Sequence, residues 1–383
     1  MHTAAQRFVA LDLLRFLAVV LMVQGHTFRE VLDVAIREQR WHGIHNYIHG
    51  YTAPIFLFSS GLAFGITTFR SWDKHLGFGP TLFKRLERYV LIILIGYALH
   101  IPRFSLTRLF ALPYERLGPA LVVDALQNIG FTLLLAELSV VALRSQKRFV
   151  ALIAAAMVAL VLAAPALWRL DLPDLHPLFT GYVNSSTGSI FPIAPWAAFL
   201  LAGILTAYAL WDPVRRSVRP NAHYALLGVG LATILLGKVL SSAGIDHVFG
   251  EHNYWKTSPY FFVVRIGVVW LVLALLMIGA KVFARAKSAS RGGLVQTLGQ
   301  ETLVIYVAHL FVLYGSPFSP GVVPLVGKTL SVVESSLLFG AVFCAMIAIA
   351  IVWHEVKTRF PVTFNHTRRL ITAALVLLFL FSS

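Results

Sequence analysis

Three side chains that could do chemistry lie in one apolar segment near the start of the chain: Asp12, Arg15 and His26. Asp12 and Arg15 are three residues apart, so they are neighbours on a helix. Arg15 and His26 are eleven residues apart, which places them on one helical stripe about 16 Å apart along the axis. Histidine titrates near neutral pH and suits general-base or nucleophilic work. The alternative from these residues alone is an Asp–Arg pair that fixes helix packing, beside an interfacial histidine.

Later apolar segments also carry polar or ionisable side chains. On insertion scales a charged residue at the centre of a membrane helix costs at least about 2.5–3.5 kcal/mol, so such residues pair up, face the protein interior or serve function. Each residue taken alone could serve simply to form a hydrogen bond between two helices. Taken together, these residues favour a polar cavity within a helix bundle. They are Asp124, Gln127, Asn128, Lys238, Arg265, Glu301, Tyr306 and His309.

Two arginines, Arg85 and Arg88, lie three apart where a basic loop enters an apolar segment. The spacing puts both guanidinium groups on one helix face, which makes a good site for phosphate groups. From the spacing alone, ordinary positive charge at a cytoplasmic membrane surface is the better interpretation.

Three histidines between residues 41 and 49 raise the question of a metal site: His42, His45 and His49. Zinc usually needs a further protein ligand or an open catalytic geometry, and no carboxylate or cysteine clusters with them. We therefore expect no metal, and interpret the segment as an amphipathic interfacial stretch or a lip that contacts a sugar. The single cysteine, Cys344, is expected to be a small buried hydrophobe.

The elements that must position these residues are membrane helices. Of the 383 residues, 58% are hydrophobic and 13% are charged, whereas soluble domains carry about one quarter charged residues. The apolar blocks are continuous rather than alternating, which favours helices over a barrel. We predict an all-α polytopic bundle of about ten or eleven transmembrane helices in a single domain over residues 1–383. The predicted spans are 8–26, 52–69, 87–102, 119–143, 149–167, 190–210, 222–240, 259–280, 297–315, 331–353 and 370–383.

The net charge of +15 could suggest nucleic acid, but its distribution argues against that partner. Nineteen Lys and Arg residues fall in alternate loops, within 70–88, 144–148, 215–219, 281–291 and 357–369, against nine in the other loops. Basic residues collect on the cytoplasmic side, where anionic lipids attract them. The N-terminus and these basic loops are therefore predicted to be cytoplasmic.

Several motifs in order along the chain resemble the heparan-alpha-glucosaminide N-acetyltransferase catalytic-domain family. The Arg15–His26 spacing and the Arg85–Arg88 pair are also similar to the wider acyltransferase-3 membrane enzymes. The motifs extend from residue 8 to about 314. They are Leu11-Asp12-Leu-Leu-Arg15, Gly25-His26, Ala53-Pro54-Ile-Phe-Leu-Phe-Ser-Ser-Gly61, Asp124-Ala-Leu-Gln127-Asn-Ile-Gly130, Phe191-Pro-Ile-Ala-Pro195-Trp196 and Leu298-Gly299-Gln-Glu301-Thr-Leu-Val-Ile-Tyr306-Val-Ala-His309.

The resemblance implies transmembrane acyl transfer. An acyl-CoA, most often acetyl-CoA, would bind from the cytoplasm as co-substrate, without a metal. Its acyl group would pass to a hydroxyl or amine of a sugar or glycolipid on the other side of a cell membrane, a bacterial inner membrane being the expected one. Membrane lipids are the other expected partners, and a homodimer stays open. The alternative is a non-enzymatic transporter or lipid-handling protein with the same polar cavity.

The resemblance also suggests roles for individual residues. His26 would act as base or nucleophile at the outer mouth, with Asp124 orienting it. Arg15 and Asp12 would lie along the acyl-CoA tunnel, with Arg85 and Arg88 on the CoA phosphates. The remaining cavity candidates would meet the acceptor or a developing oxyanion: Gln127, Asn128, Trp196, Lys238, Arg265, Glu301, Tyr306 and His309.

Overall fold

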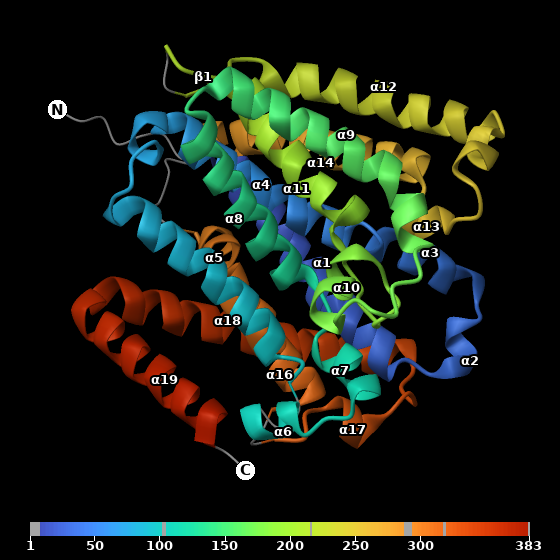
Figure 1. Cartoon of the computed structure of the whole chain (residues 1–383), viewed down its shortest axis with the longest axis vertical. Coiled ribbons are helices and arrows are strands. Elements are labelled where there is room, and N and C mark those ends of the chain that lie inside the picture. Colours follow the sequence, from blue (N-terminus) through green and yellow to red (C-terminus); the bar gives the residue numbers. More distant parts are fainter. Residues whose placement is uncertain (1–7, 102–104, 215–216, 287–292, 317–318, 382–383) are drawn as a thin grey trace. The chain divides into compact units, whose positions relative to one another are not determined.

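The computed structural model of the chain describes residues 8–101, 105–214, 217–286, 293–316 and 319–381 (Figure 1). The described chain divides into two compact units. Unit 1 contains Pro54–Leu275, and unit 2 contains Val9–Ala53 together with the chain from Leu276 onward. Five of the basic residues counted for orientation lie outside the described residues: Arg103, Arg215, Arg216, Lys287 and Arg291.

Unit 1 is built on long helices, with α5 packed against α8 and α9 packed against α11. One short antiparallel pair, β1 with β2, joins Trp211 to Val218 and Asp212 to Ser217. The elements are α4 (Thr52–Arg70), η1 (Trp72–His75), α5 (Pro80–Ala98), α6 (Leu106–Phe110), α7 (Tyr114–Ala120), α8 (Ala125–Leu143), α9 (Gln146–Trp168), α10 (Pro177–Val183), α11 (Ile193–Leu210), β1 (Trp211–Asp212), β2 (Ser217–Val218), α12 (Ala222–Ser242), η3 (Ile245–Phe249), α13 (Tyr254–Thr257) and α14 (Pro259–Ala286), whose last turns belong to unit 2.

Unit 2 is centred on the first helix of the chain, which packs against α15, α16 and α18. The elements are α1 (Val9–Val31), α2 (Val34–Arg37), α3 (Arg40–His49), α15 (Leu294–Gln300), α16 (Thr302–Tyr314), α17 (Val323–Val326), α18 (Val332–Arg359) and α19 (Pro361–Phe381). A capping box between Ser331 and Glu334 starts α18, because each side chain accepts a hydrogen bond from the other residue's backbone N–H.

The predicted fold class is confirmed: the chain is an all-α, polytopic membrane protein. In the part of the chain that is described, nine helices are long and apolar enough to cross a membrane, or ten if a bent pair counts as one span. Helices lie at all eleven predicted spans, but α5, at predicted span 87–102, is not among the nine. Its first turns carry Lys84, Arg85, Glu87 and Arg88, which lower its hydropathy.

The predicted span 297–315 is a broken helix. Helices α15 and α16 meet at an angle of 80° on either side of Glu301. Helix α15 packs tightly on α1, since a Cβ added to Gly299 would lie 2.5 Å from the backbone oxygen of Asp12. Only glycine fits this approach. Gly299, two residues before Glu301, therefore lies directly against the start of α1.

Small residues bring two membrane helices of unit 1 together. A Cβ added to Gly61 of α4 would lie 1.8 Å from the backbone oxygen of Leu200 in α11, and one added to Gly65 would lie 2.5 Å from Cβ of Ala207. Small residues such as these two glycines permit close approach of membrane helices.

The expectation for the single cysteine was wrong. Cys344 lies on α18 but is exposed on the surface of the protein. In a membrane helix an apolar side chain can face lipid as readily as the protein interior, so hydropathy does not predict which one it faces.

Candidate functional site

His26 lies near the end of α1 in a small polar cluster of unit 2. Its Nδ1 is 3.0 Å from the hydroxyl of Tyr314, the last residue of α16. The Tyr314 hydroxyl in turn donates to Oε1 of Glu30, one helical turn beyond His26, at 3.3 Å. The imidazole, the phenol and the carboxylate therefore form a chain of hydrogen bonds, the histidine–tyrosine relay.

The direction of this relay follows from proton counting. A tyrosine hydroxyl carries one proton, and a carboxylate can only accept. Because Tyr314 gives its proton to Glu30, it accepts a hydrogen bond from Nδ1–H of His26. In the neutral imidazole the lone pair then lies on Nε2, the nitrogen that a base or nucleophile would use.

A second histidine of α16 lies beside the relay. The ring of His309 is fully buried and its centroid is 5.2 Å from that of His26, edge-on. His309 Nδ1 lies 3.0 Å from the carbonyl oxygen of Ile305. Tyr306 contacts His309 at 5.7 Å between ring centroids. The structure thus brings together three of the predicted site residues, His26, Tyr306 and His309.

The histidine-rich segment forms α3, which packs against α1 next to His26. The ring nitrogen Nε2 of His45 is 3.0 Å from the side-chain amide of Gln24. The rings of His45 and His49 are 4.2 Å apart, and a Cβ on Gly25 would lie 2.6 Å from His49 Nδ1. No group of three or more His, Cys, Asp or Glu among the described residues could hold a metal ion, these histidines included.

Asp12 and Arg15 lie on the same helix as His26, toward its start. The side chain of Asp12 is buried, and that of Arg15 is half-buried. Arg15 and His26 keep the eleven-residue spacing within the uninterrupted helix α1, so they lie about 16 Å apart along its axis.

The polar residues of α8 have internal partners in unit 1. Asp124 is the N-cap of α8 and forms a capping box with Gln127, and its Oδ2 lies 3.6 Å from Nε2 of His100. Asn128 donates to the backbone oxygens of Phe191 and Pro192 at 3.0 and 3.2 Å. These contacts start the helix and hold the 191–192 turn against it.

Three other candidates belong to the later helices of unit 1. The guanidinium of Arg265 is buried on the ring of Phe261, 3.8 Å from its centroid, and lies 5.7 Å from the ring of Trp196. Both are cation–π contacts, and the one with Phe261 is the shorter. Lys238 lies exposed on α12.

The two arginines of α5 differ from each other. Arg85 Nη1 is 2.9 Å from Oε2 of Glu137, a fully buried carboxylate in the middle of α8. His75 Nδ1 lies 3.0 Å from the other oxygen of Glu137 and also contacts Arg85. Arg88 lies exposed. The charge of Arg85 is thus already balanced within the protein, in what we call the Glu137 cluster (His75, Arg85 and Glu137).

Comparison with known protein families gives a match over a large part of the chain. The family model described as heparan-alpha-glucosaminide N-acetyltransferase, catalytic, matches residues 7–239, more than half of the chain. The chain belongs to this family. Because the family is one of acetyltransferases, membership indicates a membrane acetyltransferase. No curated protein sequence matches the chain.

The match to the acetyltransferase family includes α1 with Asp12, Arg15 and His26, and also Arg85, Arg88 and the polar residues of α8. It ends before α15 and α16, so Glu301, Tyr306 and His309 lie outside it. Glu301 is buried at the helix break, where Nδ1 of His354 lies 3.0 Å and Nζ of Lys357 2.5 Å from its Oε1. These contacts tie the break to the end of α18.

Sequence reasoning missed Glu30, Tyr314, His75 and Glu137. Glu30 follows His26 by four residues on the same helix, which is the spacing at which side chains meet. Glu137 is an ionisable residue inside an apolar segment, and that alone marks it for attention. For Tyr314 the sequence carries no comparable signal, since it lies 288 residues from its partner His26.

Proposed function

We propose that this protein transfers an acyl group, most often acetyl, from cytoplasmic acyl-CoA to a hydroxyl or amine of a glycan or glycolipid on the other side of the cell membrane. The observation that carries the proposal is the histidine–tyrosine relay at the end of α1, in a chain that belongs to an acetyltransferase family. Its imidazole has Nε2 as the basic nitrogen, which is what acyl transfer at neutral pH requires.

In the proposed reaction Nε2 of His26 takes the proton of the acceptor hydroxyl or amine. The acceptor oxygen or nitrogen attacks the thioester carbonyl, the carbon–sulfur bond breaks, and the proton leaves on the CoA thiol. In a second version Nε2 itself attacks the thioester carbonyl, the carbon–sulfur bond breaks, and CoA leaves as the thiolate while an acyl-histidine forms. The acceptor oxygen or nitrogen then attacks the acyl carbon, the bond to Nε2 breaks, and the acceptor proton passes to the CoA thiolate. Both versions need Nδ1–H held by Tyr314, which fixes the ring and favours the positive charge that develops on it.

Within this proposal Arg15 and Asp12 line the path of the acyl-CoA chain along α1, about 16 Å and about 21 Å from His26 along the helix axis. A pantetheine arm is long enough to bridge such a distance. The exposed Arg88 is the better of the two α5 arginines for a phosphate group, because Glu137 already balances the charge of Arg85. The distribution of basic loops supports a cytoplasmic donor side in this proposal.

The test is acyl transfer by the full chain in sealed vesicles of known sidedness. Labelled acetyl-CoA is added on one side, and label on glycan acceptors and release of free CoA are both measured. We expect CoA release only when an acceptor is present. The variant His26→Ala should abolish both signals, while His247→Ala, a matched change at an exposed histidine of unit 1, should leave them unchanged.

Turnover by His26→Ala at the wild-type rate would contradict the catalytic role of His26. Movement of a glycan or lipid across the vesicle membrane with no CoA released by the wild-type protein would favour the transporter alternative instead.

A further inference from the structure

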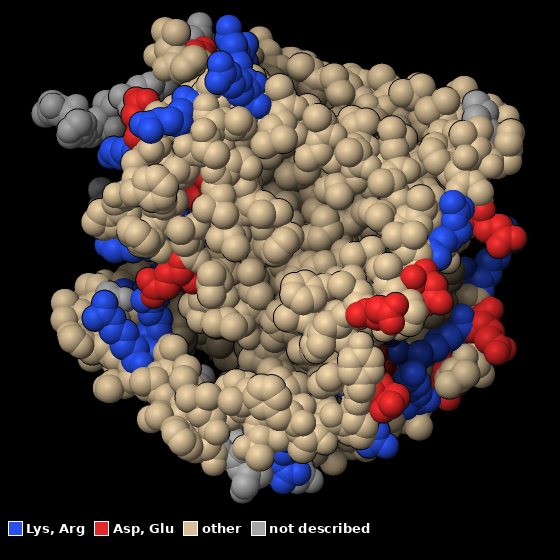
Figure 2. Space-filling model, in the orientation of Figure 1, with Lys and Arg blue, Asp and Glu red and all other residues tan. Residues whose placement is uncertain are grey.

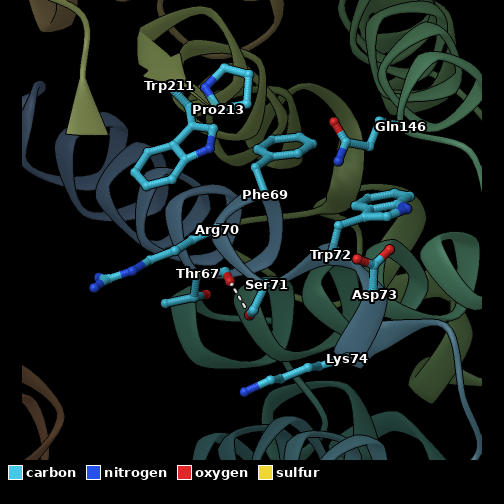
Figure 3. Close-up of a pocket in the computed structure, with 10 residues that line it drawn as sticks. All are labelled: Thr67, Phe69, Arg70, Ser71, Trp72, Asp73, Lys74, Gln146, Trp211 and Pro213. Carbon is cyan, nitrogen blue, oxygen red and sulfur yellow. Dashed lines mark hydrogen bonds between the residues drawn. The ribbon is translucent and has the colours of Figure 1, made fainter. Parts of the chain in front are cut away.

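Unit 1 contains a cavity of about 720 Å³ that is lined by none of the residues of the histidine–tyrosine relay (Figure 3). Its volume falls in the range of about 300–1,000 Å³ that is typical of small-molecule sites. It is lined by the end of α4, the η1 turn, the first residue of α9 and the β1 turn. Basic loops predicted to be cytoplasmic contain these segments.

One wall of the cavity carries two cations and two hydroxyls in a regular pattern. Thr67, Arg70, Ser71 and Lys74 all line it, at positions i, i+3, i+4 and i+7. Helix α4 ends at Arg70, and the backbone of Ser71 is not helical (φ −138°, ψ 43°) before the η1 turn begins. Within α4, Thr67 and Arg70 are three residues apart and share one face. Lys74, in the η1 turn, joins them in the cavity lining. In Figure 3 the charged ends of Arg70 and Lys74 extend to the same side.

The Glu137 cluster forms hydrogen bonds with the two hydroxyl residues of this wall. Arg85 Nη2 donates to the Thr67 hydroxyl at 3.2 Å, and the Ser71 hydroxyl lies 3.4 Å from His75 Nε2. Both hydroxyl residues therefore connect the cavity to a carboxylate that is fully buried. A polar wall fixed by a second set of hydrogen bonds is what a binding site requires, and surface charge alone does not need it.

The rest of the lining suits an anion that carries an apolar or aromatic part. Trp211 is half-buried and lines the cavity together with Phe69 and Trp72, whose rings are stacked at 6.1 Å. Gln146 is the first residue of the 23-residue helix α9, so the positive end of a long helix dipole lies at the cavity. One acidic residue, Asp73, lines it as well, against the two cations.

We propose that this cavity binds a phosphate ester, with Arg70 and Lys74 on the phosphate oxygens and the aromatic wall on the rest of the ligand. Arginine and lysine are the side chains that bind phosphate most strongly. The phosphate can come from the nucleotide end of acyl-CoA or from the headgroup of an anionic lipid. The site goes beyond the proposed acyl transfer, and only the nucleotide source rests on that function.

The experiment measures two probes on the purified full chain. The first is 3′,5′-ADP, titrated in neutral detergent. The second is phosphatidylglycerol against phosphatidylcholine, retained on the protein and counted by native mass spectrometry. The variant Arg70→Gln/Lys74→Gln should weaken the binding of one probe about tenfold or more, the loss expected for two charge-assisted contacts. The single variant Lys74→Gln should show part of the same loss.

The matched control is Lys147→Gln/Arg148→Gln, which removes two exposed charges at the start of α9 that do not line the cavity. It should leave binding within about twofold, since separated exposed charges are screened at ordinary salt. Loss with 3′,5′-ADP assigns the nucleotide source, and loss with phosphatidylglycerol assigns the lipid source. The proposal is overturned if neither probe binds the wild type, or if the control loses as much as the cavity variant.

Wild-type acyl transfer separates this result from the proposed function. A protein that transfers acetyl groups but binds neither probe contradicts only the cavity, whereas one that binds a probe without transferring acetyl groups contradicts only the acyltransferase.

Discussion

Two clusters of this protein are built from the same parts, a histidine and a glutamate, and differ in how the two are joined. In the Glu137 cluster of unit 1 the carboxylate contacts His75 and Arg85 directly and is fully buried. In the histidine–tyrosine relay of unit 2 a phenol separates His26 from Glu30, and the imidazole is only half-buried. The first arrangement balances the buried carboxylate directly with two neighbouring groups, and the second holds the imidazole through the Tyr314 hydroxyl near the end of a membrane helix.

The contrast teaches that an intramembrane ionisable residue is not by itself a sign of chemistry. In a direct ion pair within a bundle, the attraction between the two charges offsets part of the free energy that their burial costs, and the pair fixes how the helices pack. Figure 2 shows that most of the visible surface carries neither Lys nor Arg, which appear in a few groups. Glu137 is fully buried, and its partners His75 and Arg85 lie beside it.

The strongest test of the contrast is His26→Gln, which keeps the size and a hydrogen-bonding group but removes the basic nitrogen. We expect acyl transfer to fall at least about 100-fold, the usual contribution of a general base or nucleophile. Thermal unfolding in detergent should be almost unchanged, because the side chain is half-buried. Loss of activity and stability together would place His26 with the structural clusters.

The opposite result is expected for Glu137→Ala. Removing the shared carboxylate leaves His75 and Arg85 without their buried anion, and breaking a buried pair in this way costs about 3–5 kcal/mol. Unfolding in mixed micelles measures the change. The control is Glu355→Ala, whose partner Arg359 is largely exposed, so that its loss should be small. Equal stability of Glu137→Ala and wild type would contradict the structural role.

The sequence was sufficient for the fold because its apolar blocks are long enough to cross a bilayer, and hydropathy detects length and composition. It did not predict the 80° bend at Glu301, since a bent helix pair has the same composition as a straight helix. It did not predict that Cys344 is exposed, because lipid and protein interior are both apolar.

The candidate site was predictable only in part for a related reason. The Arg15–His26 spacing follows from helix geometry, which is local. The partners of His26 depend on which distant helix packs beside it, and Tyr314 comes from a helix that the sequence places almost at the other end of the chain. Polar residues inside apolar segments could be listed from sequence, but their pairing could not.

A smaller effect is expected when the middle of the relay is removed. Tyr314→Phe keeps the ring packing and deletes the hydroxyl that accepts from Nδ1–H of His26. We expect kcat to fall about tenfold, the value of one hydrogen bond to a group that becomes charged, with KM for the acyl donor unchanged. A rise in KM at constant kcat would show that Tyr314 only shapes the site. Tyr224→Phe is the matched control, since Tyr224 is exposed on α12 of unit 1 and lies outside the relay.

The smallest effect should come from the carboxylate at the end of the relay. In Glu30→Gln the side-chain oxygen still accepts from Tyr314, so the direction of the hydrogen bonds is kept and only the negative charge is lost. The Tyr314 hydroxyl separates the Glu30 carboxylate from His26, and the carboxylate also contacts Arg29. We therefore expect its charge to contribute about 0.5 kcal/mol to transition-state stabilisation, so that kcat falls roughly twofold. In the double variant with Tyr314→Phe this twofold loss should disappear, because the carboxylate acts on His26 only through the phenol. Losses that multiply independently in the double variant would mean that Glu30 acts on the acceptor or on solvent, and that the relay stops at Tyr314.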